Sequence, residues 1–486
     1  MTNHDPLPRS TPEARGVSSS AISAFIEAIE QQNIELHSMM LIRHGHVIAE
    51  GWWSPYSADR IHQLYSLSKS FTSTAIGIAI DEGRLSVDDL VLSFFPDKQP
   101  EKLNEHLATM QVHHLLTMST GHLEDALGPT RELGNGDWVA GFFSVPPDQE
   151  PGSIFTYNNA ATFMLSAILQ SLTGVRLVEY LRPRLFEPLG ISQAYWYQNP
   201  QGINYGFSGL HITTEAIARL GQLYLQKGKW QGEQLVSKAW VETATTKHIA
   251  TDSSPDDEKP DWSQGYGYQF WQCRNNAYRA DGAFGQFCLV MPEQNAVLAT
   301  TAGNENMQAI LDLVWEHLLP AMSNQALPDN VNTQSKLARQ LERLAIQPAQ
   351  GKAASQMAAT VSGKTYVTHN EDDESSEMTL HFHKDTCTLI VVDDDGEHSV
   401  RCGYNGWTAG TTTFLDTEEV PIVSSGAWTA DDVFRLDIRY IQTPHCLTID
   451  FHFDEDDIRV KMRFNVNFGP LELPQAIGRV KAQVTP

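Results

Sequence analysis

The stretch LYSLSKSFTS, residues 64–73, places Ser66 and Lys69 three positions apart at the start of an apolar run. The run continues to Ile80 with apolar side chains on nearly every face, and Gly83 follows, so the sequence predicts a buried helix over 66–80. Residues three apart share one face of a helix, so Lys69 is expected beside Ser66. The first turn of a helix also has unpaired N–H groups, which stabilise negative charge developing on a serine oxygen.

Two interpretations of this pair are open. In a reaction centre, the amine beside an apolar helix loses hydration, which lowers the pKa of Lys69 until the neutral amine can accept the Ser66 proton. In an ordinary helix start, Ser66 caps the helix and Lys69 points into solvent, which is the commoner meaning of an isolated S-x-x-K. The pattern occurs once in the chain, at Ser66. Other residues must therefore decide between the two.

A second group of candidates lies in FTYNNAATFMLSAIL, residues 155–169, where the chain leaves a Pro-Gly turn at 151–152 and passes through Tyr157 and Asn159 into an apolar helix. A nearby lysine ammonium would stabilise the Tyr157 phenolate and couple the two titrations. The Asn159 amide can donate and accept hydrogen bonds, to a substrate amide and to Lys69 at once. The segment 197–199 repeats the Y-x-N pattern, but we favour Tyr157 because a turn entering a helix presents a side chain rigidly.

Composition narrows the class of protein. The chain of 486 residues is 41 % hydrophobic and 19 % charged, with a net charge of −25 and a pI near 5.0. We expect a globular protein with neither a nucleic-acid nor a membrane partner, because it would repel phosphate and has no apolar run of about 20 residues. Five cysteines without a C-x-x-C pair, and a start without an apolar leader, predict reduced thiols and a cytoplasmic location.

Three regions are expected along the chain. Residues 1–322 begin and end with strands and helix around a helical insertion, residues 323–358 form a polar linker with a short helix, and residues 359–486 form an antiparallel β domain. For the β domain, three roles stay open: covering the active site, forming a homodimer interface, or stabilising the chain. The expected strands of the first region are 38–43, 46–52, 265–271, 286–291 and 296–301, and its terminal helices are 18–32 and 307–319.

Seven segments between about residues 20 and 320 resemble, in the same order, the serine β-lactamase and penicillin-binding-protein superfamily. The similarity is greatest to its class C-related branch of esterases, D-aminopeptidases and 6-aminohexanoate-dimer hydrolases. The resemblance implies an α+β fold, a β-lactamase/transpeptidase-like antiparallel sheet flanked by helices with an inserted helical lobe, and an active site in the cleft between them. It also implies a lipocalin-like barrel or a sandwich for the C-terminal domain. The segments are SMMLIRHGHVIAEGWW, LYSLSKSFTSTAIGIAIDEGRLSVDDLV, HHLLTMSTGH, FTYNNAATFMLSAIL, LFEPLGI, GFSGLHITTEAIARLGQLYLQKGKW and DGAFGQFCLVMPEQNAVLATTAGN.

The resemblance also implies roles for single residues. Ser66 matches the acylated nucleophile, Lys69 the lysine of the first motif, and Tyr157 and Asn159 the second motif. The backbone N–H groups of Ser66 and Ala283 would form the oxyanion hole.

The third motif departs from the family pattern, because Ala280-Asp281-Gly282 stands where penicillin-recognising members carry K-T-G. The cation that pairs with a substrate carboxylate is missing there, and Asp281 brings a negative charge that disfavours β-lactams. Two further candidates for substrate contact are His122, on a loop that the resemblance places near the cleft, and Gln286, on the strand edge. The alternatives are an ordinary surface-loop histidine and a glutamine that hydrogen-bonds a neighbouring loop.

These residues predict a serine hydrolase that cleaves a small neutral or cationic ester or amide through an acyl-enzyme, without a cofactor or metal. A β-lactamase or D-amino-acid peptidase of the same superfamily is the alternative. A non-catalytic ligand-binding protein on the same fold is the alternative from another class. An α/β-hydrolase is disfavoured because the chain contains no G-x-S-x-G.

Overall fold

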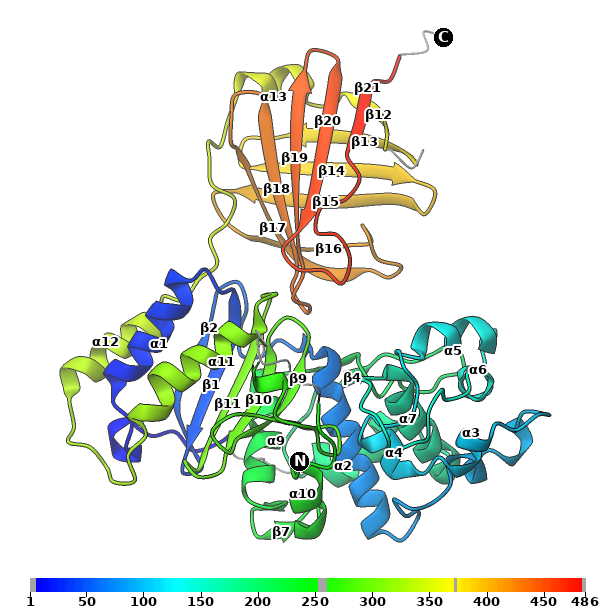
Figure 1. The fold of residues 1–486 in the computed structure, drawn as a ribbon. Coiled ribbons are helices and arrows are strands. Elements are labelled where there is room, and N and C mark those ends of the chain that lie inside the picture. The colour runs from blue at the N-terminus through cyan, green and yellow to red at the C-terminus, as the bar shows by residue number, and fades with distance from the viewer. Residues whose placement is uncertain (1–5, 252–259, 371–373, 483–486) are drawn as a thin grey trace. The chain divides into compact units, whose positions relative to one another are not determined.

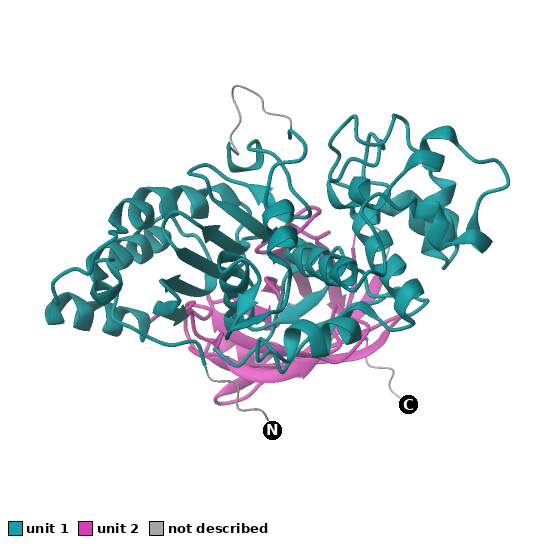
Figure 2. Cartoon of the chain, turned by 90° about the horizontal axis from the view of Figure 1, so that it is seen from below, with its two compact units in different colours: residues 1–51, 58–343 teal, residues 52–57, 344–486 magenta. Residues whose placement is uncertain are grey.

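The computed structural model describes residues 6–251, 260–370 and 374–482. The chain divides into two compact units, coloured separately in Figure 2. Unit 1 comprises residues 1–51 and 58–343, and unit 2 comprises residues 52–57 and 344–486.

Unit 1 is built on an antiparallel six-stranded sheet, visible in Figure 1. Its strand order is β2 (His46–Trp52), β1 (Leu36–Arg43), β11 (Ala296–Ala302), β10 (Gln286–Met291), β9 (Tyr278–Gly282) and β8 (Trp271–Gln272). Every residue of β1, β9, β10 and β11 is buried, as expected for strands covered on both faces. Four of the five predicted strands are confirmed.

The fifth predicted strand, 265–271, is wrong in all but its last residue. Tyr266, Tyr268 and Phe270 alternate as in a strand, but the backbone there is irregular and Gln269 has a φ of 64°. The segment lies against α2 (Ser68–Asp81), whose Ser70 and Ser73 hydroxyls donate to the carbonyls of Gln269 and Tyr268 at 2.6 and 2.7 Å. The sheet edge is the two-residue β8, and β9, which pairs with it, had no alternating pattern to reveal it.

Helices cover this sheet. The predicted helix 18–32 is α1 (Ser19–Gln31), capped by the Ser18 side chain, and the predicted helix 307–319 is α11 (Met307–Leu313) continued by a wider turn over Val314–Leu318. α9 (Thr214–Leu225) packs against β1, β10 and β11. The helical lobe and its neighbours (Figure 1) are α3 (Glu105–Thr109), α4 (Val112–Leu116), α5 (Leu127–Gly134), α6 (Trp138–Ser144), α7 (Asn159–Thr173), α8 (Leu177–Leu181) and α10 (Lys238–Ala244).

The sequence interpretation of α2 as a buried helix is confirmed, although a 3-10 turn over Tyr65–Leu67 precedes it. All its residues from Ser68 to Ala79 are buried. The polar ones are satisfied, because Thr72 donates to the carbonyl of Gly206 at 2.8 Å and the Thr74 hydroxyl lies 2.8 Å from that of Tyr224. Since a buried polar group is costly without a partner, these bonds fix where α2 lies in unit 1.

Unit 2 is a closed β-barrel of nine strands, which settles the choice between barrel and sandwich. A parallel pairing of β15 with β17, at Gly403–Ser425 and Tyr404–Gly426, closes it, and a tenth strand pairs outside with β17. Apolar side chains including Tyr366, Trp428 and Phe451 fill the interior. The strands are β12 (Thr365–His369), β13 (Ser375–Phe382), β14 (Thr386–Asp393), β15 (Gly396–Tyr404), β16 (Thr408–Thr412), β17 (Val420–Trp428), β18 (Val433–Tyr440), β19 (Cys446–Asp454), β20 (Asp457–Phe464) and β21 (Ala476–Val480).

The residues expected to form a linker are divided between the units. α12 (Val331–Leu341) belongs to unit 1, where Gln334 donates to Glu13 at 2.9 Å and Lys336 pairs with Glu27 at 3.0 Å. Residues from 344 onward belong to unit 2, together with the short excursion 52–57 that follows β2.

Within the described ranges, no single helix is long and apolar enough to cross a bilayer. Asn159–Thr173 and Leu177–Phe186, bent by 69°, reach that length and composition only as a pair.

Gly282, at the end of β9, has no room for a side chain. A Cβ added there would lie 1.9 Å from the carbonyl oxygen of Leu64 and 3.1 Å from the amide nitrogen of Leu67. We predict that Gly282→Ala lowers the free energy of unfolding by about 1–3 kcal/mol, because backbone atoms must separate. Thermal unfolding followed by circular dichroism measures this. The matched control is Gly128→Ala in α5, where open space surrounds the new methyl group, and equal melting temperatures for both variants would contradict the prediction.

Candidate active site

The turn that carries Ser66 is conformationally strained. Tyr65 has a φ of 48°, in the left-handed region that a bulky aromatic residue rarely occupies. Its ring packs edge-on against Phe284, with centroids 5.4 Å apart, and Phe284 itself has a φ of 69°. Strain of this kind clusters at functional sites, where the surrounding structure holds it. Ser66 is half-buried directly after this residue and before α2.

Lys69 lies in the first turn of α2 and is only 1 % exposed. Its Nζ lies 2.9 Å from Ser66 Oγ, 2.7 Å from Asn159 Oδ1 and 2.9 Å from the carbonyl oxygen of Phe207. No carboxylate of the described residues forms an ion pair with it. Burial lowers the pKa of Lys69 to about 7, although the charges of Asp125 and Asp281 oppose this shift.

Tyr157 lies over this lysine, with Lys69 Nζ 4.7 Å from the centre of its ring. The ring stacks on Trp271 at 5.6 Å, which fixes its orientation. Burial raises the pKa of Tyr157, and the nearby Asp281 charge raises it further, while a hydrogen bond with Ser66 opposes both. The sequence interpretation of a stabilised phenolate is therefore wrong, since Tyr157 is a phenol at neutral pH and can act as a proton donor.

Asn159 is the first residue of α7, and its amide faces Lys69. The rival pair of the Y-x-N pattern has another role, because the Asn199 side chain accepts from the backbone of Gln201 and Ile203 and so closes its own loop. The structure thus brings Ser66, Lys69, Tyr157 and Asn159 together. It adds the Phe207 carbonyl, which no side-chain motif could have revealed.

The third-motif residues lie at the end of β9, beside the Ser66 turn. Gly282 touches that turn, and Ala283 follows as the first residue outside the β9–β10 ladder, which ends at the Gly282–Gln286 pair. Asp281 does not present the bare negative charge that the sequence suggested, because Arg279 pairs with it at 2.9 Å. Both side chains are buried, at 0 and 7 % exposure. Burial raises the pKa of Asp281, and Arg279 limits that rise.

His122 and Gln286 hold the backbone around the site. The His122 ring is 2 % exposed, with Nδ1 2.9 Å from the Thr120 hydroxyl and Nε2 2.9 Å from the Val145 carbonyl. Burial lowers its pKa. Gln286 donates to the Ala283 and Ala302 carbonyls at 2.9 and 2.8 Å, and accepts from the Ala302 N–H. It therefore fixes the turn that presents Ala283.

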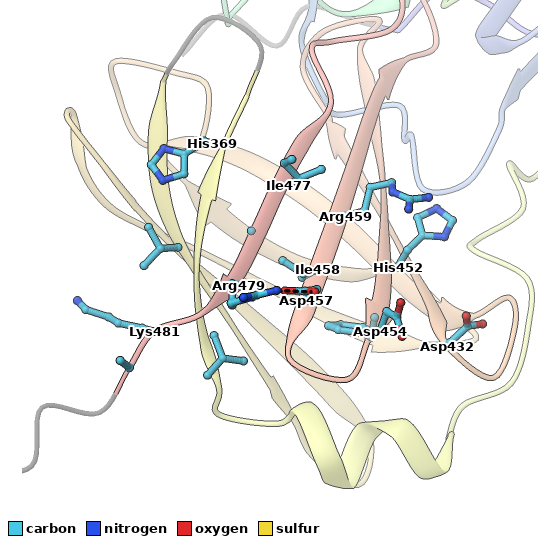
Figure 3. Close-up of a pocket in the computed structure, with 15 residues that line it drawn as sticks. His369, Asp432, His452, Asp454, Asp457, Ile458, Arg459, Ile477, Arg479 and Lys481 are labelled. Atoms are coloured by element: carbon cyan, nitrogen blue, oxygen red, sulfur yellow. Dashed lines mark hydrogen bonds and ion pairs between the residues drawn. The ribbon is translucent and has the colours of Figure 1, made fainter.

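Unit 2 holds a separate open groove of about 1040 Å³ over β12, β19, β20 and β21 (Figure 3). Two of its basic residues form ion pairs, Arg479 with Asp457 at 2.6 Å and Lys481 with Glu377 at 2.5 Å. It contains no serine, lysine and tyrosine in contact with one another. Among the residues that the structure describes, no group of three or more His, Cys, Asp or Glu side chains could hold a metal ion. The chemistry therefore points to unit 1.

Comparisons with known proteins agree with this geometry. Residues 22–313 match the Beta-lactamase family. The chain is 26 % identical over 321 residues to the 6-aminohexanoate-dimer hydrolase of Paenarthrobacter ureafaciens, covering 61 % of this chain and 80 % of that protein. It is 24 % identical over 208 residues to esterase EstB of Burkholderia gladioli, covering 37 % of this chain and 53 % of the esterase.

Among solved structures, EstCE1, a hydrolase with promiscuous acyltransferase activity, superposes with a TM-score of 0.52 at 18 % identity, covering 61 % of this chain and 99 % of EstCE1. That likeness concerns the fold. The family match extends over more than half of the chain and includes all four residues that meet at Ser66. The chain therefore belongs to the Beta-lactamase family of serine hydrolases.

Proposed function

We propose that this protein hydrolyses a small neutral or cationic ester or amide through an acyl-enzyme on Ser66. The observation that carries the proposal is a lysine amine 2.9 Å from Ser66 Oγ, buried so that its pKa falls to about 7. A neutral amine has two N–H donors and one lone pair. The carbonyl oxygens of Asn159 and Phe207 take the two donors, so the lone pair is left for the Ser66 hydroxyl proton.

The proposed reaction proceeds in two steps. As Ser66 Oγ attacks the substrate carbonyl carbon, its proton moves to Lys69 Nζ, and the N–H groups of Ser66 and Ala283 stabilise the oxyanion. Tyr157 then donates its phenolic proton to the leaving group and recovers one from the Lys69 ammonium. In the second step, water loses a proton along the same route and attacks the ester carbonyl, which restores Ser66 and releases the acid.

Charge around the site favours a substrate without a carboxylate near the scissile bond. The cation at the third motif, Arg279, is fully buried and neutralised by Asp281, so it is not available to a ligand. Asp125 adds an exposed negative charge beside Asn159. A like charge on the substrate would lose solvation there without gaining a partner. Penicillins and D-amino-acid peptides are therefore the second choice among substrates.

Covalent labelling separates an enzyme from a binding protein on the same fold. We expect a fluorophosphonate to add once to the wild-type protein and not to Ser66→Ala, as measured by intact mass. Ser68→Ala is the matched control, because its buried hydroxyl contacts the Leu210 N–H instead of Lys69, and it should label. No adduct on the wild type, together with no turnover of activated esters, would favour the non-catalytic alternative.

The lowered pKa of Lys69 predicts a pH profile. Because the neutral amine is the base, kcat/KM for a p-nitrophenyl ester should rise with pH through about 7 and level off above it. Lys69→Arg should lower kcat by about 10²–10⁴-fold, because a guanidinium keeps its proton. The control is Lys336→Arg on α12, an exposed site that should leave the rate unchanged. A flat profile between pH 5 and 9 would contradict this role.

Substrate charge gives a third test. Benzylpenicillin and its methyl ester share one lactam and differ by the carboxylate charge. We expect the methyl ester, and neutral p-nitrophenyl esters, to have kcat/KM at least about tenfold above benzylpenicillin, which corresponds to about 1.4 kcal/mol. Faster hydrolysis of the free carboxylate would overturn the substrate class while leaving the nucleophile intact.

A further inference from the structure

We propose that Asp125 is a positioning residue of this site, which orients the Asn159 amide and thereby directs the Lys69 lone pair at Ser66. The inference rests on the proposed function. Asp125 lies in the loop between α4 and α5 and belongs to none of the motifs that the sequence revealed. Its role follows from four contacts that link it to the nucleophile.

Asp125 binds both the backbone and the side chain of Asn159. Oδ1 of Asp125 accepts the backbone N–H of Asn159 at 2.8 Å, and Oδ2 accepts the side-chain NH₂ of Asn159 at 2.7 Å. Oδ1 also accepts the Leu127 N–H at 3.2 Å, so the carboxylate links the start of α5 to Asn159, the first residue of α7. A negative charge at the start of a helix also interacts favourably with its unpaired N–H groups.

Asp125 also determines which end of the Asn159 side-chain amide faces Lys69. The NH₂ group of Asn159 must face Asp125, because a carboxylate can only accept, so Oδ1 faces Lys69 Nζ at 2.7 Å. If the amide turned over, Lys69 would meet an NH₂ group instead of an acceptor. Its own lone pair would then be drawn toward that group and away from the Ser66 hydroxyl. Asp125 therefore keeps the Lys69 lone pair directed at the Ser66 hydroxyl.

Hydrogen bonds fix the loop that carries Asp125. The N–H of the next residue, Ala126, donates to Asn158 Oδ1 at 3.2 Å, and Leu123 N–H donates to Asp148 at 3.0 Å. His122, which lies on the same loop as Asp125, forms a hydrogen bond with the Val145 carbonyl. Asn158 is fully buried, so the loop is tied to the start of α7 itself. The Asp125 carboxylate is exposed, and yet its backbone is fixed on both sides.

Charge gives this residue a signature that a purely structural residue lacks. The charged or titratable side chains near Lys69 are Asp125, Asp281 and Tyr157, and Arg279 pairs with Asp281. The negative charge of Asp125 raises the pKa of Lys69 against the effect of burial. Removal of the Asp125 charge must therefore lower the pKa of Lys69, whatever the effect of the substitution on the rate.

The test compares Asp125→Asn with Glu124→Gln, which removes the same charge from the neighbouring exposed residue. In Asp125→Asn the new NH₂ opposes that of Asn159, so we expect kcat to fall at least about tenfold with little change in KM. The midpoint of the acid limb of kcat/KM should also shift to lower pH. Glu124→Gln should retain the wild-type kcat, and the melting temperatures of both variants should show that they fold.

Each outcome is decisive. A wild-type kcat in Asp125→Asn, or a lower kcat with an unmoved acid limb, would overturn the positioning role. If Asp125→Asn does not fold, Asp125→Glu takes its place. This variant keeps the charge on a longer side chain, so it should lower kcat without moving the acid limb of kcat/KM to lower pH. A wild-type protein that forms no Ser66 adduct would refute the proposed function itself, which is a separate result.

Discussion

The site depends on one physical constraint, a lysine amine held out of water with no ion-paired carboxylate among the residues that the structure describes. Lys69 is 1 % exposed and is surrounded by a hydroxyl, an amide oxygen and a backbone carbonyl. Burial of a cation disfavours its charged form, so the amine titrates about where it must to serve as a base near neutral pH. The hydroxyl bonds that fix α2, and the glycine at position 282, are what keep this amine and Ser66 in register.

Two nearby carboxylates partly offset the effect of burial on the pKa of Lys69. Asp281 and Asp125 both raise the pKa of Lys69, and without them the amine would be a weaker base. Arg279 screens Asp281, since the two form a buried pair at 2.9 Å. A buried pair contributes little stability of its own, but loss of one partner leaves an uncompensated charge. The same pair removes the cation that a carboxylate substrate would need, so one arrangement tunes the base and limits the substrates.

Much of this could be predicted from the sequence, for reasons that differ between elements. Strands β18, β19 and β20 were evident because one face is wet and their period is two. β9 was not, because burial on both faces erases the period that distinguishes a strand. The segment 265–270 misled in the opposite way, because its aromatic residues alternate although its backbone is irregular. Ser66, Lys69, Tyr157 and Asn159 stand in local motifs. The Phe207 carbonyl and the Asp125 carboxylate do not, since only the fold brings them within hydrogen-bond distance. The expected phenolate of Tyr157 failed because burial and the Asp281 charge raise the pKa of that phenol.

The central claim is the ionisation of one amine, and it can be measured without a substrate. Lysine labelled with ¹³C at Cε and ¹⁵N at Nζ, assigned by comparison with Lys69→Arg, reports the titration of Lys69 by NMR. The account predicts a midpoint near 7, far below the 10.5 of an ordinary lysine. A midpoint above 10 would contradict it, because Ser66 would then have no base within reach.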